Sequence, residues 1–214
     1  NWIGKSEGTE IDFKLENPIN GFEYIKVFTT RVDTLFGTTY IVLAPENKLI
    51  KEINKIYKSK DINTYLEEIH KLTHIQRKDE SKDSIGINLG IYAIHPFTQE
   101  RLPIYSADYV IGGYGTGAVM AVPAHDKRDF NFAKKYNIGI NYVIESKIEN
   151  IDYKNSPYLD KGILVNSNQF TGLYSDKAKI EITKELARLK LGRKKTQYRL
   201  RDWLISRQRY WGCP

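Results

Sequence analysis

The sequence has almost no cysteine: Cys213 is the only one among 214 residues. A single thiol cannot form a disulfide within the chain, and it excludes a zinc site built from cysteines. This scarcity is typical of proteins from a reducing compartment. Long apolar runs are also missing, and no charged and then apolar leader opens the chain. We therefore expect neither secretion nor membrane insertion.

Several signatures of common enzyme classes are absent as well. The sequence has no GxSxG motif, no P-loop and no GxGxxG dinucleotide motif. Cys213 stands one residue from the end and His125 has no obvious serine partner, which disfavours covalent catalysis. His70 and His74 have the spacing of metal ligands, but Lys71 stands where a zincin has glutamate. No third ligand is evident, so we predict no metal site.

Basic charge is plentiful but concentrated at one end. The chain has 33 Lys and Arg against 26 Asp and Glu, a net charge of +7. Residues 188–214 alone contain nine basic residues and one acidic residue, so the rest of the chain is nearly neutral. Tyr198, Trp203, Tyr210 and Trp211 lie among them, and this combination suits phosphate contacts and base stacking. A solvated helix face, or a surface that docks on a further domain, would explain the same pattern.

Length and periodicity predict a single α+β domain. Apolar and β-branched runs predict strands at 9–15, 24–30, 38–44, 85–94, 102–105, 118–122, 140–144 and 162–165. Helical periodicity predicts helices at 45–56, 62–75 and 175–189, the last ending by Gly192, and a further one beginning near Asp126. Because strands and helices do not alternate regularly, we expect a mixed or barrel-like sheet.

The stretch from Gly112 to Tyr136 combines glycines, a small apolar run and a cluster of charges. Its apolar run at 118–122 predicts a buried strand, which the following proline ends before a helix begins. Asp126 suits the N-cap of that helix. Asp129 suits either the first helical turn or contact with a ligand, and the pattern alone leaves both open.

A second polar motif, TTRVDT, occupies residues 29–34 at the end of a predicted strand. Thr29, Thr30 and Thr34 fit ordinary β-propensity. However, hydroxyls, the Arg31 guanidinium and a carboxylate converge here with no apolar role, which favours a ligand site. Together the two motifs suit the binding of an ammonium-bearing substrate and the positioning of water.

These motifs resemble those of one family. YGTGAVMAVPAHDKRDFNFAKKY is similar to the aspartate-bearing motif of the editing domain of bacterial-type leucyl-tRNA synthetase, and TTRVDTLFGTTY is similar to its threonine-rich motif. NWIGKSEG and RLRDWLISRQRYWGCP, at the two ends, resemble the segments that join this domain to the catalytic core. The resemblance therefore covers essentially the whole chain, in order.

The resemblance implies a small mixed β-barrel ringed by helices. Residues 9–192 would be the editing domain, with 1–8 and 193–214 as connectors to a missing catalytic core, because the synthetase's HIGH and KMSKS motifs are absent. The implied activity is post-transfer editing, the hydrolysis of the ester joining norvaline, isoleucine or a similar wrong amino acid to leucine tRNA. One methylene is worth only about 1–3 kcal/mol in an apolar pocket, so a synthesis site needs this second sieve.

The resemblance further implies partners and setting. The partners would be the 3′ end of leucine tRNA with its aminoacyl-adenosine and the rest of the synthetase chain. Editing would need no cofactor, since ATP belongs to the catalytic core. The protein would be a monomer in the bacterial cytoplasm or an organelle matrix, with no membrane. Two alternatives stay open: an editing domain for valine or isoleucine tRNA, and a non-catalytic tRNA-docking module.

Site roles follow motif by motif from the same resemblance. Asp129 matches the aspartate that binds the substrate α-ammonium, and Thr34 matches the threonine that excludes the leucine side chain. Thr29 and Thr30 would contact the ester or the attacking water, and Arg31 would hold the loop or the substrate. The remaining candidate substrate contacts are Tyr114, Met120, Val122, His125 and, as support, Asp126. Val32 replaces the family's usual proline, so we expect a less rigid loop.

Overall fold

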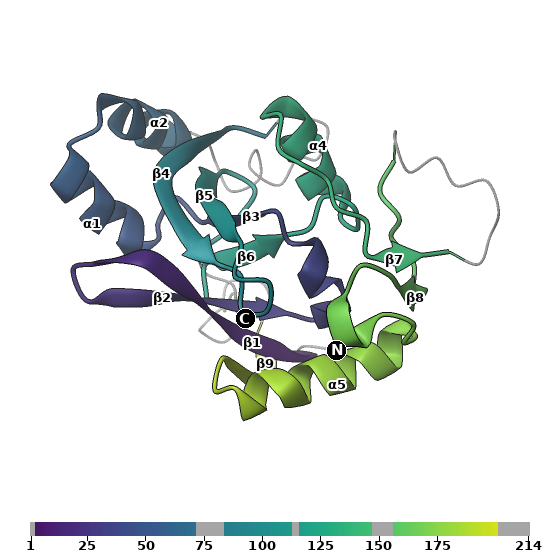
Figure 1. Ribbon diagram of the computed structural model, residues 1–214. Helices are drawn as coiled ribbons and strands as arrows, with labels where there is room; N and C mark the ends of the chain where they lie inside the picture. The colour runs from purple at the N-terminus through teal and green to yellow at the C-terminus, as the bar shows by residue number, and fades with distance from the viewer. Residues whose placement is uncertain (1–2, 72–83, 113–115, 147–155, 201–214) are drawn as a thin grey trace, which may run out of the picture.

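The computed structural model describes residues 3–71, 84–112, 116–146 and 156–200. A curved seven-stranded sheet with helices packed around it dominates the fold (Figure 1). Its strands are β1 (Ile3–Ile19), β2 (Phe22–Thr29), β3 (Tyr40–Leu43), β4 (Gly86–Ile94), β5 (Arg101–Ala107), β6 (Ala118–Ala121) and β9 (Gly192–Leu200). They lie in the order β2-β1-β4-β5-β3-β6, and β9 pairs with β1. Among these seven described strands, β3 and β5 pair in parallel and the other pairs are antiparallel.

The expectation of a closed barrel is wrong, because the sheet is open. Its end strands β2 and β6 approach each other, but no ladder joins them in the parts of the chain that the structure describes. The sequence after β6 gives a physical reason. The Val122 amide donates to the Asp129 carboxylate at 2.8 Å, and Pro123 has no amide hydrogen. Strand β6 therefore stops after four residues, without the donors that a further ladder would need.

The helices are α1 (Lys48–Tyr57), α2 (Lys60–Lys71), α4 (Lys127–Lys135) and α5 (Ser175–Arg188), with short 3-10 turns η1 (Val32–Gly37) and η2 (Asn168–Phe170). A separate two-stranded ladder joins β7 (Ile144–Glu145) to β8 (Ile163–Leu164). Side chains cap the N-termini of α1 and α4. The side-chain carbonyl oxygen of Asn47 and the carboxylate of Asp126 accept amide hydrogens of the first helical turn. No helix of the described ranges is long and apolar enough to cross a membrane.

Most predicted elements are confirmed within a few residues, and two differences matter. The predicted strand at 140–144 contains only the first residue of β7. Beyond α5, the basic segment 192–200 forms strand β9 rather than a helix face. Gly192 belongs to this strand, and a Cβ there would lie 2.6 Å from the Glu10 carbonyl oxygen, so the close β1–β9 approach favours glycine. Predictions on Trp203, Tyr210 and Trp211 fall outside the described residues, as do those on His74 and Tyr114.

Two apolar clusters hold the sheet and helices together. The larger joins β1, β2, β4 and α1 with α5, and its fully buried members include Phe13, Leu35 and Ile182. The smaller lies between α4 and strands β3 and β5, where Tyr40 stacks on Phe132 with ring centroids 5.5 Å apart. Burial of this kind is the main favourable term in folding. The second cluster holds α4 against the sheet, and it therefore also fixes the position of Asp129 on that helix.

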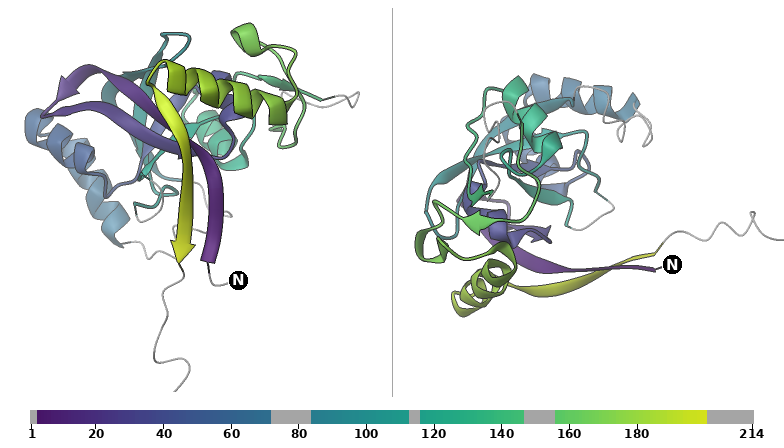
Figure 2. Two further views of the ribbon diagram at one scale, coloured as in Figure 1. Left: turned by 90° about the horizontal axis from the view of Figure 1, so that it is seen from below. Right: turned by 90° about the vertical axis from the view of Figure 1, so that its right-hand side faces the viewer.

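Strands β1 and β9 form a two-stranded ribbon that extends away from the body (Figure 2). The ladder runs from Ile3 opposite Leu200 to Ile11 opposite Gly192. At its base, the buried Glu10 carboxylate forms ion pairs with Arg193 and Lys195. Part of the basic charge of β9 is therefore neutralised by its partner strand.

Candidate active site

The threonine motif forms the link between β2 and η1. The Thr29 hydroxyl accepts the Arg31 amide at 3.0 Å, and the Thr34 hydroxyl donates to the Arg31 carbonyl at 2.8 Å. Thr30 is exposed, whereas Thr34 is buried. Val32 is buried too and joins the larger apolar cluster, so packing holds this loop without the φ restraint that a proline would add.

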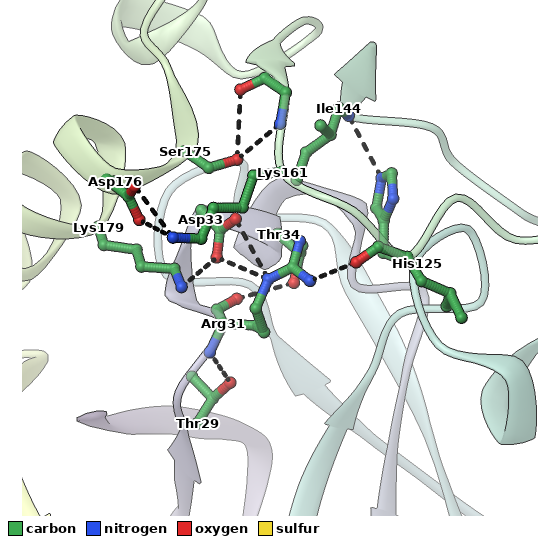
Figure 3. A network of polar contacts seen from close by, with 12 residues as sticks. Thr29, Arg31, Asp33, Thr34, His125, Ile144, Lys161, Ser175, Asp176 and Lys179 are labelled. Atoms are coloured by element: carbon green, nitrogen blue, oxygen red, sulfur yellow. Dashed lines mark hydrogen bonds and ion pairs between the residues drawn. The ribbon is translucent and has the colours of Figure 1, made fainter. Parts of the chain in front are cut away.

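Arg31 connects this loop to two other segments. Its Nε lies 3.2 Å from Asp33 Oδ1, and its Nη1 donates to the Leu159 carbonyl at 2.9 Å. The Asp33 side chain has no solvent exposure, and Lys179 of α5 lies 3.8 Å from it (Figure 3). Two cations therefore face one buried carboxylate. The Arg31 Nη2 atom is also buried and has no hydrogen-bond partner within the described residues.

The acidic motif begins where β6 ends. Asp126 caps α4, because its Oδ1 accepts the amides of Arg128 and Asp129 at 2.8 and 3.2 Å. This confirms the predicted N-cap. Asp126 also lies on the surface, with a side chain that is 40% exposed.

Asp129 is buried, with 7% of its surface exposed. Its Oδ2 accepts the Val122 amide at 2.8 Å and its Oδ1 accepts the Tyr109 hydroxyl at 3.0 Å. Both donors are neutral, and Asp129 has no salt bridge anywhere in the described ranges. Burial, followed by repulsion from Asp126, raises the pKa of the Asp129 carboxyl to about 7. This carboxylate lacks the cationic partner that a buried charge requires.

Both ring nitrogens of His125 are hydrogen-bonded to main-chain groups. Its Nδ1 donates to the Tyr158 carbonyl at 2.8 Å, while Nε2 accepts the amides of Val143 and Ile144 at 3.1 and 3.2 Å. Burial lowers the pKa of His125 to about 4, so the ring is neutral at neutral pH. With both nitrogens occupied, the imidazole has no lone pair for proton abstraction. The geometry gives it a structural role in orienting the segment that follows β6.

A short segment joins the two motifs. Tyr158 and Leu159 are adjacent, and their carbonyls accept from His125 and Arg31, respectively. Gly37, at the end of η1, lies close to the residue that follows β6, since a Cβ there would lie 3.1 Å from a Val122 methyl carbon. The structure thus brings the threonine loop beside the start of the acidic motif. Two motifs about 90 residues apart in sequence belong to one region of the fold.

The structure describes two of the other candidate residues. Met120 and Val122 are buried in the larger apolar cluster at the end of β6, beside η1. The sequence analysis assigned no role to Asp33, Tyr109 or Lys179, although Asp33 lies inside TTRVDT. Nothing in the local pattern around Lys179 indicates its contact with Asp33, because that contact depends on how α5 packs. Among the described residues no group of three His, Cys, Asp or Glu is arranged to hold a metal ion.

The fold and the two joined motifs define a class of protein, the hydrolytic editing domains of aminoacyl-tRNA synthetases. The family model described as "Leucyl-tRNA synthetase, editing domain" matches residues 1–187. The chain belongs to that family, and this favours leucine over the valine or isoleucine alternative.

Similar proteins match this chain over its whole length. The leucine–tRNA ligase of Clostridium perfringens (strain SM101) is 51% identical over 213 residues, covering 100% of this chain and 26% of that protein. The leucine–tRNA ligase of Fervidobacterium nodosum is 46% identical over 215 residues, with the same two coverages. A solved complex of Agrobacterium radiobacter K84 agnB2 LeuRS with tRNA and LeuAMS has a TM-score of 0.71 at 36% identity, and covers 100% of this chain and 23% of that one. The chain spans about a quarter of these relatives' length.

Proposed function

We propose that this domain hydrolyses the ester between a wrong amino acid and leucine tRNA. Water adds across the ester bond, so that the hydroxyl joins the amino-acid carbonyl and the proton goes to the ribose oxygen. The observation that carries the proposal is Asp129, a buried carboxylate held only by neutral donors. An aminoacyl ester supplies the missing cation as its α-ammonium, and the resulting charge-assisted bond would fix the carbonyl for attack.

The threonine loop supplies the other part of the proposed site. Arg31 acts by holding the loop, because its guanidinium is already bonded to Asp33 and Leu159. The exposed Thr30 and the half-buried Thr29 would contact the ester or the attacking water. An ester needs orientation and stabilisation of the developing oxyanion more than a strong base, which agrees with the saturated state of His125.

Thr34 is the proposed gate against leucine. Its side chain is buried and its hydroxyl is directed to the Arg31 carbonyl, so its volume is fixed beside the loop. Met120, Val122 and Tyr114 would line the rest of the pocket, with Asp126 and His125 as support. Removing the Thr34 hydroxyl and methyl would admit the branched leucine side chain, because exclusion by volume depends on atoms being present.

The ribbon supports the proposed domain limits. The first residues of β1 pair with the last residues of β9, from Ile3 opposite Leu200 to Gly8 opposite Lys195. Segments 1–8 and 193–214 would thus enter and leave the rest of a cytoplasmic synthetase side by side. Docking of tRNA on this basic end, without catalysis, is the competing function, because β9 carries four basic residues and the Glu7 and Glu10 carboxylates of β1 balance only two of these charges.

The decisive experiment is deacylation of leucine tRNA carrying norvaline, isoleucine or leucine. We expect the domain to clear the first two and spare the third, and Thr34→Ala to clear all three. Addition of EDTA or removal of ATP should change nothing, since no cofactor is proposed. If tRNA binds but no ester is cleaved, aminoacyl-adenosine esters decide between the alternatives. Inactivity on these small esters as well would establish a docking module.

A further inference from the structure

Tyr109 contacts the carboxylate of Asp129 from outside both motifs. Its hydroxyl donates to Asp129 Oδ1 at 3.0 Å, while the Val122 amide occupies Oδ2. A carboxylate offers about four lone-pair positions, so about two remain for a further donor. Nothing in the resemblance points to Tyr109, which lies just after β5.

The fold fixes the position of Tyr109 through its neighbours. The preceding residue, Asp108, is bonded twice to Ile85: its amide donates to the Ile85 carbonyl at 3.0 Å, and its carboxylate accepts the Ile85 amide at 3.1 Å. The Tyr109 ring packs edge to face on Phe132, with centroids 5.7 Å apart. Phe132 stands three residues after Asp129 on α4, so the same helix receives the ring and the hydroxyl.

The Tyr109 hydroxyl is the hydrogen-bond donor in this contact, and the Asp129 carboxylate is the acceptor. Burial and the neighbouring Asp129 charge raise the pKa of Tyr109 well above its ordinary value, so the phenol keeps its proton. It therefore only donates to the carboxylate. The neighbouring Tyr40 hydroxyl of β3 donates to the Asp129 main-chain carbonyl at 3.1 Å, which fixes the backbone rather than the carboxylate.

We propose that Tyr109 is a positioning residue for editing, whose hydroxyl fixes the rotation of the Asp129 carboxylate so that its remaining lone pairs meet the substrate α-ammonium. This inference rests on the proposed function. A carboxylate held at one oxygen alone would rotate about its Cβ–Cγ bond, and a charge-assisted bond depends on such alignment. Tyr109 would act on the reaction only through Asp129.

The contact also affects the ionisation of Asp129. Burial and Asp126 raise the pKa of the Asp129 carboxyl, whereas the Val122 amide, the Tyr109 hydroxyl and Arg128 lower it. Tyr40 and Tyr109 are the titratable groups that face it from the sheet side, and both remain neutral phenols. Loss of the Tyr109 hydroxyl therefore raises the pKa of Asp129 further. Ammonium binding would then need a higher pH.

The test compares Tyr109→Phe with the matched control Tyr105→Phe. Both keep a ring packed on Phe132, but Tyr105 has no hydrogen bond to Asp129 among the described contacts. For norvalyl-tRNA we expect Tyr109→Phe to lower kcat/KM about tenfold at neutral pH and to shift the acid limb of the pH profile upward by about one unit. Tyr105→Phe should match the wild type in both measurements.

A substrate without the ammonium separates positioning from damage to the fold. The α-hydroxy analogue of norvalyl-tRNA offers no cation, so Tyr109→Phe and the wild type should cleave it equally. Equal loss on both esters, or an unchanged pH profile, would overturn the role of Tyr109. A ¹³C titration of the Asp129 carboxyl gives a readout independent of activity, and an unshifted midpoint would also overturn it. If the wild type cleaves neither mischarged tRNA nor small esters, the proposed function fails instead.

Discussion

Two buried aspartates, one in each motif, have opposite electrostatic surroundings. Asp33 is fully buried and faces two cations, Arg31 at 3.2 Å and Lys179 at 3.8 Å. Asp129 is almost as deeply buried, yet its carboxylate receives only an amide and a phenol. The fold neutralises the first charge and leaves the second without a cation. A carboxylate of the first kind supports structure, and one of the second kind is suited to bind a cationic ligand.

The two aspartates also connect different elements of the fold. Asp33 connects the threonine loop to α5, because Lys179 belongs to that helix. Asp129 connects the end of β6 to α4, and under the proposed function it would also bind the substrate. Catalytic sites commonly carry such an unfavourable group, and its cost in stability is offset by the packed scaffold around it. Each of the following substitutions tests one side of this comparison.

The largest expected effect is on the activity of Asp129→Asn. The amide can accept from the Val122 amide and donate to the Tyr109 oxygen, so the fold should survive, but the negative charge that binds an ammonium is gone. We expect deacylation of norvalyl-tRNA to fall about a thousandfold, as for loss of one partner of a desolvated charge pair. The measurement is kcat/KM, with Asp176→Asn as an exposed control. Retained activity would remove Asp129 from substrate binding.

Asp33→Asn should act mainly on stability. It leaves Arg31 and Lys179 facing a neutral amide, and both cations are largely buried, with side-chain exposures of 30% and 27%. We expect the free energy of unfolding to fall by about 3 kcal/mol, the lower end for a broken buried ion pair. Urea unfolding measures it. A variant as stable as the wild type would show that solvent already screens this pair, and the contrast with Asp129 would disappear.

The sequence predicted the local parts of this picture better than the long-range ones. The Asp126 cap and the end of β6 at Pro123 depend on neighbouring residues, and both are confirmed. The open sheet and strand β9 depend on pairings between distant segments, and the sequence analysis missed both. The contact of Lys179 with Asp33 has the same origin. Roles for Asp129 and Thr34 came from resemblance, while the burial that makes Asp129 unusual is visible only in the folded chain.

A smaller effect is expected in the pH dependence of stability. The folded Asp129 carboxyl has a pKa of about 7, above its ordinary 3.8, so the folded state holds a proton that the unfolded state has lost. This group therefore makes stability fall as pH rises from about 4 to about 7. His125 has the opposite slope, because its folded pKa is lowered to about 4.

Asp129→Asn removes one of these slopes and leaves the other. Relative to the wild type, the variant should gain about 2 kcal/mol between pH 5 and pH 8. Urea unfolding of both proteins at the two pH values gives the difference, in which His125 and the other carboxylates cancel. A constant difference at both pH values would mean that Asp129 ionises normally. Its burial without a cationic partner would then have no energetic consequence.

The smallest expected effect concerns the exposed pair beside the buried one. Lys161 and Asp176 lie in the same polar region as Asp33 (Figure 3), at 2.7 Å, but their side chains are 50% and 58% exposed. Solvent screens such pairs and side-chain entropy opposes them, so Lys161→Ala should leave both unfolding and deacylation within experimental error. A double substitution with Asp33→Asn should then be no worse than Asp33→Asn alone. A loss in Lys161→Ala that disappears in the Asp33→Asn background would instead show that the exposed pair helps to hold Lys179 against Asp33, and membership of the network, rather than burial, would decide which charges matter.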